Sequence, residues 1–215
     1  MMSTVETNFL FVRHGETDWN RAGRWQGHAD VPLNGTGRRQ AEAIAARLNR
    51  WQVTITTIVS SDLRRCRQTV APISEKTGLQ PVFDSVWRER DVGDFQGYSI
   101  AENQERYPEL FAQAAASGDL TPPRGESFAA LQKRAVGAFA ALQTAVTPGA
   151  VVLVVTHGAF MRSLFAHIIG LPPGMMGGFA TGGNTGLSEV RVKAGRATLT
   201  RMNDTSHLEG SIHLS

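Results

Sequence analysis

Short apolar runs alternate with amphipathic stretches along the chain. The runs cover residues 8–12, 55–59 and 151–155, and each is rich in β-branched or aromatic side chains and short enough to form a buried strand. Between them, residues 36–51 and 126–146 place apolar side chains at helical spacing with a charged face opposite. This alternation predicts an α/β fold, a three-layer α/β/α sandwich around a mostly parallel central sheet.

The regions outside this alternation are predicted to be additions to a single domain over residues 1–215. Residues 94–125 have weaker periodicity, a Tyr107-Pro108 break and the turn signal "TPPRGE", which indicate a short helical cap over one end of the sheet. Near the C-terminus, "TGLSEVRV" and "RATLTRM" flank "KAG" and predict a closing hairpin. The polar residues 203–215 are expected to form a loose tail.

Composition narrows the class of protein. The hydrophobic fraction is 41% and the charged fraction 19%, and no run is long enough to cross a bilayer, so we expect no membrane partner. The net charge is only +3 and the basic residues are scattered, which argues against nucleic acid. The start of the chain has neither a basic segment nor a small-residue cleavage site, so a cytoplasmic location is expected. The single cysteine, Cys66, is predicted to be an inert thiol on a helix.

Two predicted strands end on a histidine followed by a glycine. "FVRHGE" brings Arg13 and His14 to the end of the first strand, and "VVLVVTHG" brings His157 and Gly158 to the end of another. Ligands of parallel sheets bind just outside the carboxyl ends of the strands, so the two histidines are expected to face one ligand. The glycines allow the backbone to approach an anion, and a helix that begins beyond Gly158 supplies free N–H groups for substrate binding.

The positions and the number of arginines also indicate an anionic ligand. In "IVSSDLRRCRQT", Arg64, Arg65 and Arg67 occupy the first turns of a predicted helix, where cations oppose the helix dipole unless an anion is bound. The chain has 19 arginines and 3 lysines, and the planar guanidinium fork suits phosphate or carboxylate. The helix start is therefore a second candidate element of an anion site.

Glu89, in "VWRERDVGDFQG", has two interpretations. It is either a proton donor beside the anion site or the partner of its neighbours Arg88 and Arg90 in an ion pair, which would lower its pKa. Two imidazoles, a set of arginines and one carboxyl group suit phosphoryl transfer, in which a histidine nitrogen attacks phosphorus and a carboxylic acid protonates the departing alkoxide. A zinc site made of the two histidines would lack a third ligand, so no metal or other cofactor is expected.

The chain resembles the histidine phosphatase superfamily, which includes cofactor-dependent phosphoglycerate mutases and related phosphatases. The resemblance covers nearly the whole chain through five motifs in order: "FVRHGETDWN", "GHADVPLNGTGRRQA", "SSDLRRCRQT", "RERDVGDFQG" and "VTHG". It implies that His14 is the nucleophile that becomes phosphohistidine, that Glu89 is the proton donor, and that the charge of His157 stabilises the transferred group. It also implies phosphate binding by Arg13 and Arg65 and substrate-binding roles for Asn20, Gln26, Gly27 and Thr17.

Several other arginines, tryptophans and histidines are mostly expected to have structural positions. Arg64 and Arg67 are expected on a solvated helix face, and Trp19 and Trp25 either wall the pocket or pack in the core. Surface or core positions are expected for the other histidines, His28, His167, His207 and His213.

Hydrolysis of a small phosphomonoester is the expected function, and a phosphoglycerate mutase is the first alternative. Mutases of this superfamily resemble one another in a longer segment after the position of Glu89, with a Trp-Arg-Arg sequence that this chain lacks. Together with Arg24, the cap arginines Arg106 and Arg124 would suit phosphosugars, phosphoglycerates or phosphoamino acids alike. A non-catalytic phospholigand-binding protein is a third hypothesis, and an exposed strand edge would permit a homodimer.

Overall fold

The computed structural model describes residues 5–51, 53–172 and 179–209. The strands are β1 (Thr7–Arg13), β2 (Thr57–Ser60), β3 (Val82–Phe83), β4 (Val151–Thr156), β5 (Leu187–Lys193) and β6 (Arg196–Asp204). The helices are α1 (Asp18–Arg21), α2 (Gly35–Arg50), α3 (Arg64–Thr77), α4 (Ile100–Arg106), α5 (Pro108–Ser117), α6 (Phe128–Ala145) and α7 (Gly158–Ile168). All three predicted apolar runs and both predicted amphipathic helices are present, whereas β3 and α1 were not predicted from the sequence.

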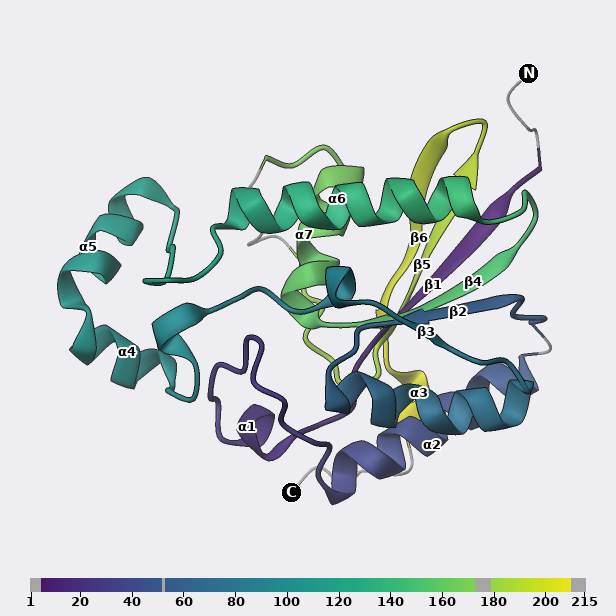
Figure 1. The fold of residues 1–215 in the computed structure, drawn as a ribbon, viewed down its shortest axis with the longest axis horizontal. Coiled ribbons are helices and arrows are strands. Elements are labelled where there is room, and N and C mark those ends of the chain that lie inside the picture. Colours follow the sequence, from purple (N-terminus) through teal and green to yellow (C-terminus); the bar gives the residue numbers. More distant parts are fainter. Residues whose placement is uncertain (1–4, 52, 173–178, 210–215) are drawn as a thin grey trace.

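The strands form one sheet in the order β3-β2-β4-β1-β5-β6. β3, β2, β4 and β1 pair in parallel, and β5 and β6 continue the sheet in antiparallel pairing. This confirms the mostly parallel sheet. β1 and β4 are neighbours, and their last paired residues are Arg13 and Thr156. β1 and β4 lie side by side in Figure 1, so His14 and His157, which follow their last paired residues, are at the same edge of the sheet.

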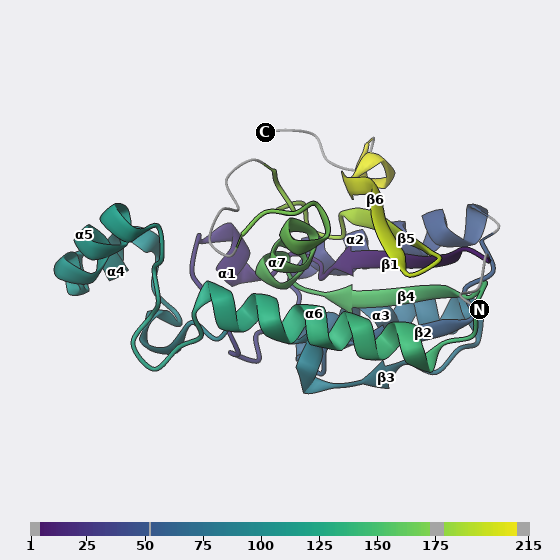
Figure 2. The same cartoon turned by 90° about the horizontal axis from the view of Figure 1, so that it is seen from above.

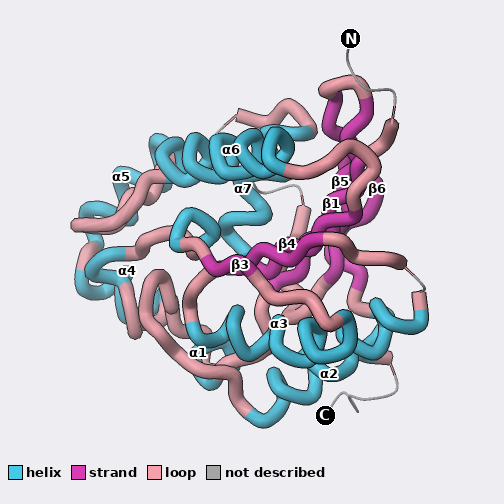
Figure 3. The backbone as a smooth tube through the Cα atoms, turned by 45° about the vertical axis from the view of Figure 1, so that its right-hand side comes forward, coloured by secondary structure: helices cyan, strands magenta, loops and turns pink. Residues whose placement is uncertain are grey.

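Alternation along β1 divides the core between the two faces of the sheet. Phe9 and Phe11 join the cluster beneath α6 and α7, and Leu10 and Val12 join the cluster beneath α2 and α3. Phe9 meets Phe139 of α6 edge to face, with ring centroids 4.9 Å apart. Figures 1 and 3 show one helix pair on each side of the sheet, so the α/β/α sandwich is confirmed.

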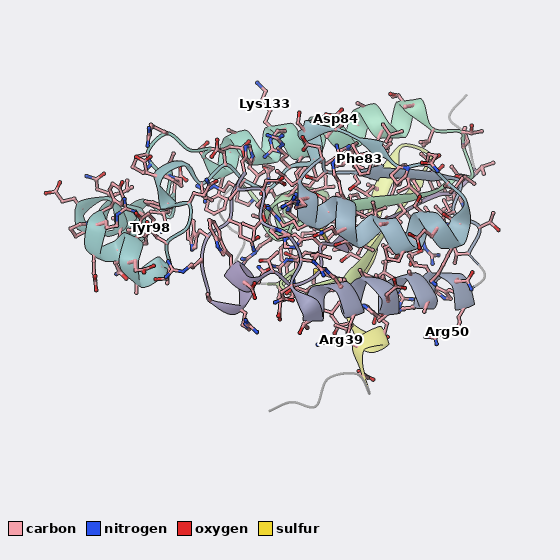
Figure 4. The ribbon with its side chains drawn as sticks, turned by 60° about the horizontal axis from the view of Figure 1, so that its bottom comes forward. Arg39, Arg50, Phe83, Asp84, Tyr98 and Lys133 are labelled. Carbon is pink, nitrogen blue, oxygen red and sulfur yellow. The ribbon has the colours of Figure 1, made fainter. Side chains whose placement is uncertain are left out.

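The outer sides of these helices carry the polar half of the amphipathic pattern. Arg39 and Arg50 of α2, and Lys133 of α6, point away from the sheet in Figure 4. The side chain of Asn34 starts α2 by accepting a hydrogen bond from the N–H of Gly37 at 2.8 Å. None of the helices in the described residues combines the length and apolar character needed to cross a bilayer.

The predicted cap segment contains α4 and α5, which project beyond the sheet (Figure 2). Ser99 starts α4 with a capping box, in which its side chain accepts from the N–H of Glu102 at 3.2 Å. Pro108 opens α5 and Gly118 ends it in a left-handed conformation. Within this segment Tyr98, labelled in Figure 4, lies against the Arg106 guanidinium, which is 3.7 Å from its ring centre.

The C-terminal hairpin is confirmed, but the loose tail is not. β5 and β6 are antiparallel and are joined at Ala194 and Gly195, which both have positive φ as a tight hairpin turn requires. Asp204 belongs to β6 and forms an ion pair with Arg47 of α2 at 2.5 Å, so the chain is held here instead of being free. A 3-10 turn, Ser206–Leu208, follows. The rest of the predicted tail, with His213, lies outside the described residues.

Candidate active site

His14 is the first side chain beyond β1, and its ring has a defined tautomer. Only 2% of the residue is exposed, and Nδ1 lies 2.7 Å from the carbonyl oxygen of Gly15. Because a carbonyl only accepts, Nδ1 carries the hydrogen and Nε2 keeps its lone pair. Burial, followed by the charges of Arg65 and Arg13, lowers the pKa of His14 well below 6.5. The ring is therefore neutral near pH 7, and Nε2 has a lone pair that is available for chemistry.

Two glycines press the loop after His14 against the start of α2. A Cβ on Gly15 would lie 2.5 Å from the carbonyl oxygen of Gly37, and a Cβ on Gly37 would lie 2.1 Å from that of Glu16. The N–H of Gly15 also donates to Thr69 Oγ1 of α3 at 2.9 Å. Side chains at either glycine would push His14 away from its position, which explains why the sequence has glycine there.

Thr17 orients Asn20, which lies in the wall of the cavity. Its side chain caps α1 by accepting from the N–H of Asn20, and Asn20 Oδ1 accepts from the Thr17 N–H, both at 3.1 Å. Thr17 is fully buried, whereas Asn20 lines the cavity. The predicted substrate contact of Thr17 is thus corrected: its side chain is consumed in the capping box, and its part is to hold Asn20.

His157, at the matching end of β4, uses both ring nitrogens within the protein. Nδ1 accepts from Arg65 Nε at 3.2 Å, and Nε2 lies 2.8 Å from Ser61 Oγ. Its ring centre is 5.2 Å from that of His14. Burial, followed by the charge of Arg65, lowers the pKa of His157 well below 6.5. The expected positive charge on His157 is not found in this arrangement, because a guanidinium already donates to the ring.

Arg65 joins three parts of the site and is fully buried. Besides its bond to His157, it donates to the carbonyl oxygens of Ala29 at 2.7 Å and Gly27 at 2.8 Å. Burial lowers the pKa of Arg65 from its usual value, yet a guanidinium stays cationic in a protein. A buried positive charge therefore lies between the two histidines and the loop that contains Gly27.

Arg13, which is half-buried, supplies a second guanidinium with an unused donor. Nη1 donates to the carbonyl of Gly182, while Nε is buried with no hydrogen-bond partner among the described residues. A Cβ on Gly158 would lie 3.3 Å from this Nε, so the glycine keeps the space beside it open. An unsatisfied buried N–H is costly, and a phosphate oxygen in the cavity would satisfy it.

Glu89 is held at the start of α7. Its Oε2 accepts from the N–H of Ala159 and its Oε1 from the N–H of Phe160, both at 3.1 Å. Arg90 contributes a third bond through its backbone N–H at 2.9 Å. Glu89 lies on the cavity wall, and its carboxyl group occupies two N–H groups at the start of α7, which the sequence analysis had expected to bind substrate.

The arginines that flank Glu89 in the sequence point elsewhere. Arg88 pairs with Asp62 at 2.6 Å. The Arg90 guanidinium stacks 3.7 Å above the Phe128 ring centre and donates to the carbonyl of Glu126. The ion-pair interpretation of Glu89 is therefore wrong in the form predicted, and the carboxyl group is left to the cavity.

The start of α3 also differs from expectation. The backbone N–H of Arg64 donates to Asp30 Oδ1 at 2.6 Å. The Asp30 carboxylate thus caps α3. The backbone N–H of Arg64, at the helix start where the arginines had indicated a bound anion, is therefore already hydrogen-bonded within the protein. The start of α7 is capped in the same way, because Glu89 accepts from the N–H groups of Ala159 and Phe160.

A cavity of about 450 Å³ collects these groups. Of the predicted site residues it is lined by Arg13, His14, Asn20, Gln26, Gly27, Arg65, Glu89 and Gly158, whereas Thr17 and His157 lie behind the wall.

Other residues that the sequence analysis considered are divided between the cavity and the cap. Trp25 and Arg24 also line the cavity, but Arg106 and Arg124 instead bind Asp94, through its carbonyl and its carboxylate respectively. Sequence reasoning missed the wall residues Arg90, Phe128, Arg162 and Phe179. Of these four, only Arg162 could have been found from the sequence, because it follows Gly158 by one helical turn and so lies on the same face of the helix.

A neutral histidine, the guanidinium groups of Arg13 and Arg65 and the carboxyl group of Glu89 surround one cavity, and this set of groups suits an enzyme that acts on phosphate esters. The family model of the histidine phosphatase superfamily (branch 1) matches residues 9–205. The chain belongs to this superfamily, and its relatives include phosphatases.

Three similar proteins illustrate the range of the family. The phosphatase PhoE of Bacillus subtilis (strain 168) is 34% identical over 96% of this chain and 99% of its own. Phosphoglycerate mutase-like protein 4 of Arabidopsis thaliana is 41% identical over 73% of this chain and 68% of its own. The structure of a mycobacterial glucosyl-3-phosphoglycerate phosphatase with VO3 superposes with a TM-score of 0.81, at 32% identity, over 91% of this chain and 98% of its own.

Proposed function

We propose that the protein hydrolyses a small phosphomonoester through a phosphohistidine on His14 and needs no metal ion. The observation that carries the proposal is the tautomer of His14, whose Nδ1 is fixed by the Gly15 carbonyl while Nε2 keeps its lone pair. The charges of Arg13 and Arg65 beside it supply what a phosphoryl group needs for binding.

In the first half of the reaction, a bond forms between His14 Nε2 and phosphorus as the ester P–O bond breaks. Arg65 and the unpaired Nε–H of Arg13 bind the oxygens that share the negative charge. The departing alkoxide takes a proton from the carboxylic acid of Glu89, which stands on the cavity wall. The products of this step are a free alcohol and phosphohistidine.

In the second half, water attacks phosphorus and the N–P bond breaks. Glu89, now a carboxylate, takes the proton of the attacking water and is ready for the next cycle. Inorganic phosphate leaves and His14 returns to its neutral form. The positive charges at the cavity are those of arginines, and the described residues contain no group of three His, Cys, Asp or Glu side chains that could hold a metal ion.

The position of the cap favours hydrolysis over the mutase alternative. Within the described residues, neither α4 nor α5 contributes to the cavity lining, and the cap arginines Arg106 and Arg124 bind Asp94 instead of facing the ligand. A mutase must keep water from its phosphohistidine until the second hydroxyl group arrives. A cavity that the cap does not cover gives water access to that intermediate.

Release of inorganic phosphate from a panel of phosphomonoesters that includes 3-phosphoglycerate tests the proposal. Isomer formation is followed in the same tubes, with and without EDTA. We expect phosphate release without isomerisation and equal rates in both conditions. Formation of 2-phosphoglycerate that depends on a bisphosphoglycerate primer would show a mutase, and inhibition by EDTA that zinc or magnesium reverses would overturn the metal-free mechanism. Absence of any phosphohistidine after incubation with the esters would favour the non-catalytic binding protein.

A further inference from the structure

A loop from the C-terminal half of the chain, residues 182–186, holds the backbone of the nucleophile. The N–H of Thr185 donates to the carbonyl of Arg13 at 3.1 Å and to that of His14 at 3.4 Å. Asn184 Nδ2 donates to the same His14 carbonyl at 3.0 Å. Two neighbouring residues of this loop therefore fix the peptide that carries the catalytic imidazole.

Thr185 has a conformation that branched residues rarely adopt. Its φ is 55°, in the left-handed region, and the residue is fully buried. Such strained residues persist only where surrounding contacts determine them, and they cluster at functional sites. Its hydroxyl donates to the Asn184 carbonyl at 2.7 Å and lies 2.9 Å from His207 Nε2. Since the single hydroxyl hydrogen is already used, Thr185 accepts from the Nε2–H of His207.

His207 is held in turn from α2. Arg47 Nη1 lies 3.3 Å from His207 Nδ1, and because a guanidinium only donates, Nδ1 accepts and Nε2 carries the hydrogen. Burial, followed by the charge of Arg47, lowers the pKa of His207 to about 4, so the ring is neutral at pH 7. Asp204 fixes Arg47 through two bonds, of 3.0 and 2.5 Å. A continuous chain of hydrogen bonds thus runs from α2 to the nucleophile loop.

We propose that His207 is a positioning residue for the nucleophile His14 and that it acts through the hydroxyl of Thr185. His207 does not line the cavity, so its effect on the reaction must pass through the loop. A small shift of the His14 backbone moves Nε2 out of line with the ester bond. Arg65, which comes from α3, keeps its place, so the loss falls on kcat more than on KM. The inference rests on the proposed phosphohistidine function.

Paired substitutions at both ends of the contact separate positioning from folding. His207→Gln keeps an N–H that can reach Thr185, whereas His207→Leu removes it. Thr185→Ser keeps the hydroxyl, whereas Thr185→Val replaces it with a methyl group of similar size. His167→Gln, at an exposed position near the end of α7, is the matched control. Each variant is measured for kcat and KM on an ester that the wild type hydrolyses, with rates expressed per folded protein from its circular dichroism.

We expect His207→Leu and Thr185→Val to lower kcat by about 10- to 100-fold, the usual cost of losing a partner that orients a catalytic ligand or residue. KM should change little, and His207→Gln, Thr185→Ser and the control should stay close to the wild type. Equal kcat per folded protein in Leu and Gln forms at position 207 would overturn the proposal. So would equal losses in Thr185→Ser and Thr185→Val, because the hydroxyl would then carry no coupling.

Nitrogen NMR of the His14 ring provides a readout without turnover. In the wild type the shifts should report hydrogen on Nδ1, and they should change in His207→Leu but not in His207→Gln. If the wild type hydrolyses no ester, the proposed function fails while this spectrum still tests the coupling. An unchanged His14 spectrum in His207→Leu would overturn the coupling even if the enzyme were active.

Discussion

The ends of β1 and β4 carry the same histidine-glycine pair but build different surroundings for the ring. At the end of β1, one nitrogen of His14 binds a carbonyl and the other is left for chemistry. At the end of β4, both nitrogens of His157 are occupied, by Arg65 and by Ser61. The histidine-glycine motif thus places an imidazole at the sheet edge in both cases. The hydrogen-bond partners of each imidazole determine whether a ring nitrogen is available for reaction or is bonded to neighbouring side chains.

The comparison predicts that the largest loss of activity follows substitution of His14. His14→Ala removes the nucleophile, so kcat should fall by on the order of 10⁴-fold or more, as for other enzymes that lose a covalent nucleophile. Phosphate release in a purified preparation measures it, and unchanged circular dichroism shows that the fold remains. Activity within a factor of about ten of the wild type would mean that a different group attacks phosphorus.

A smaller and graded effect is expected at His157, whose Nδ1 accepts a hydrogen bond from Arg65 Nε. His157→Asn keeps an acceptor near the position of Nδ1 and should cost less than His157→Leu, which should lower kcat/KM by about 10- to 100-fold. The two variants are compared by the affinity for inorganic phosphate as well as by turnover. If both variants lose as much as His14→Ala, His157 takes part in the chemical step itself.

The smallest effect is on stability, and it has a definite sign. Folding lowers the pKa of His14, His157 and His207 below 6.5, so below that pH the unfolded chain binds more protons than the folded one. The stability present above pH 6.5 should therefore be lost progressively as the pH falls, and the share from His207 is lost by about pH 4, where the folded residue titrates. Urea unfolding at pH 7 and pH 5 checks this, and a higher midpoint at pH 5 would contradict it. His207→Gln should reduce the difference.

Much of the site could be predicted because its residues sit at strand ends. The apolar run of β1 places Arg13 and His14 at the sheet edge, and parallel pairing with β4 adds Gly158, so local pattern and topology suffice. The protonation state of His157 could not be predicted, since it depends on Arg65 and Ser61, which are distant in sequence. The same holds for His207, which was expected on the surface or in the core yet reaches Thr185 through tertiary contacts that no short motif encodes.

Errors at the site also have physical causes. The arginines at the start of α3 indicated a bound anion there, but Asp30, more than thirty residues earlier, supplies the charge. Glu89 lies between two arginines in the sequence, yet in the irregular segment that joins β3 to the cap neighbouring side chains point apart. Periodicity describes which face of an element is buried, and it does not describe which partner a charged side chain finds.

The most direct test of the account is to locate the phosphoryl group on the enzyme during turnover. The wild type and His157→Asn are mixed briefly with an ester that the wild type hydrolyses, stopped with alkali to preserve phosphohistidine, and examined by mass spectrometry of their peptides. We predict one added phosphoryl group on the peptide that contains His14, in both proteins, and none in His14→Ala. A phosphoryl group on His157 or on any other residue, or hydrolysis with no phosphorylated enzyme, would contradict it.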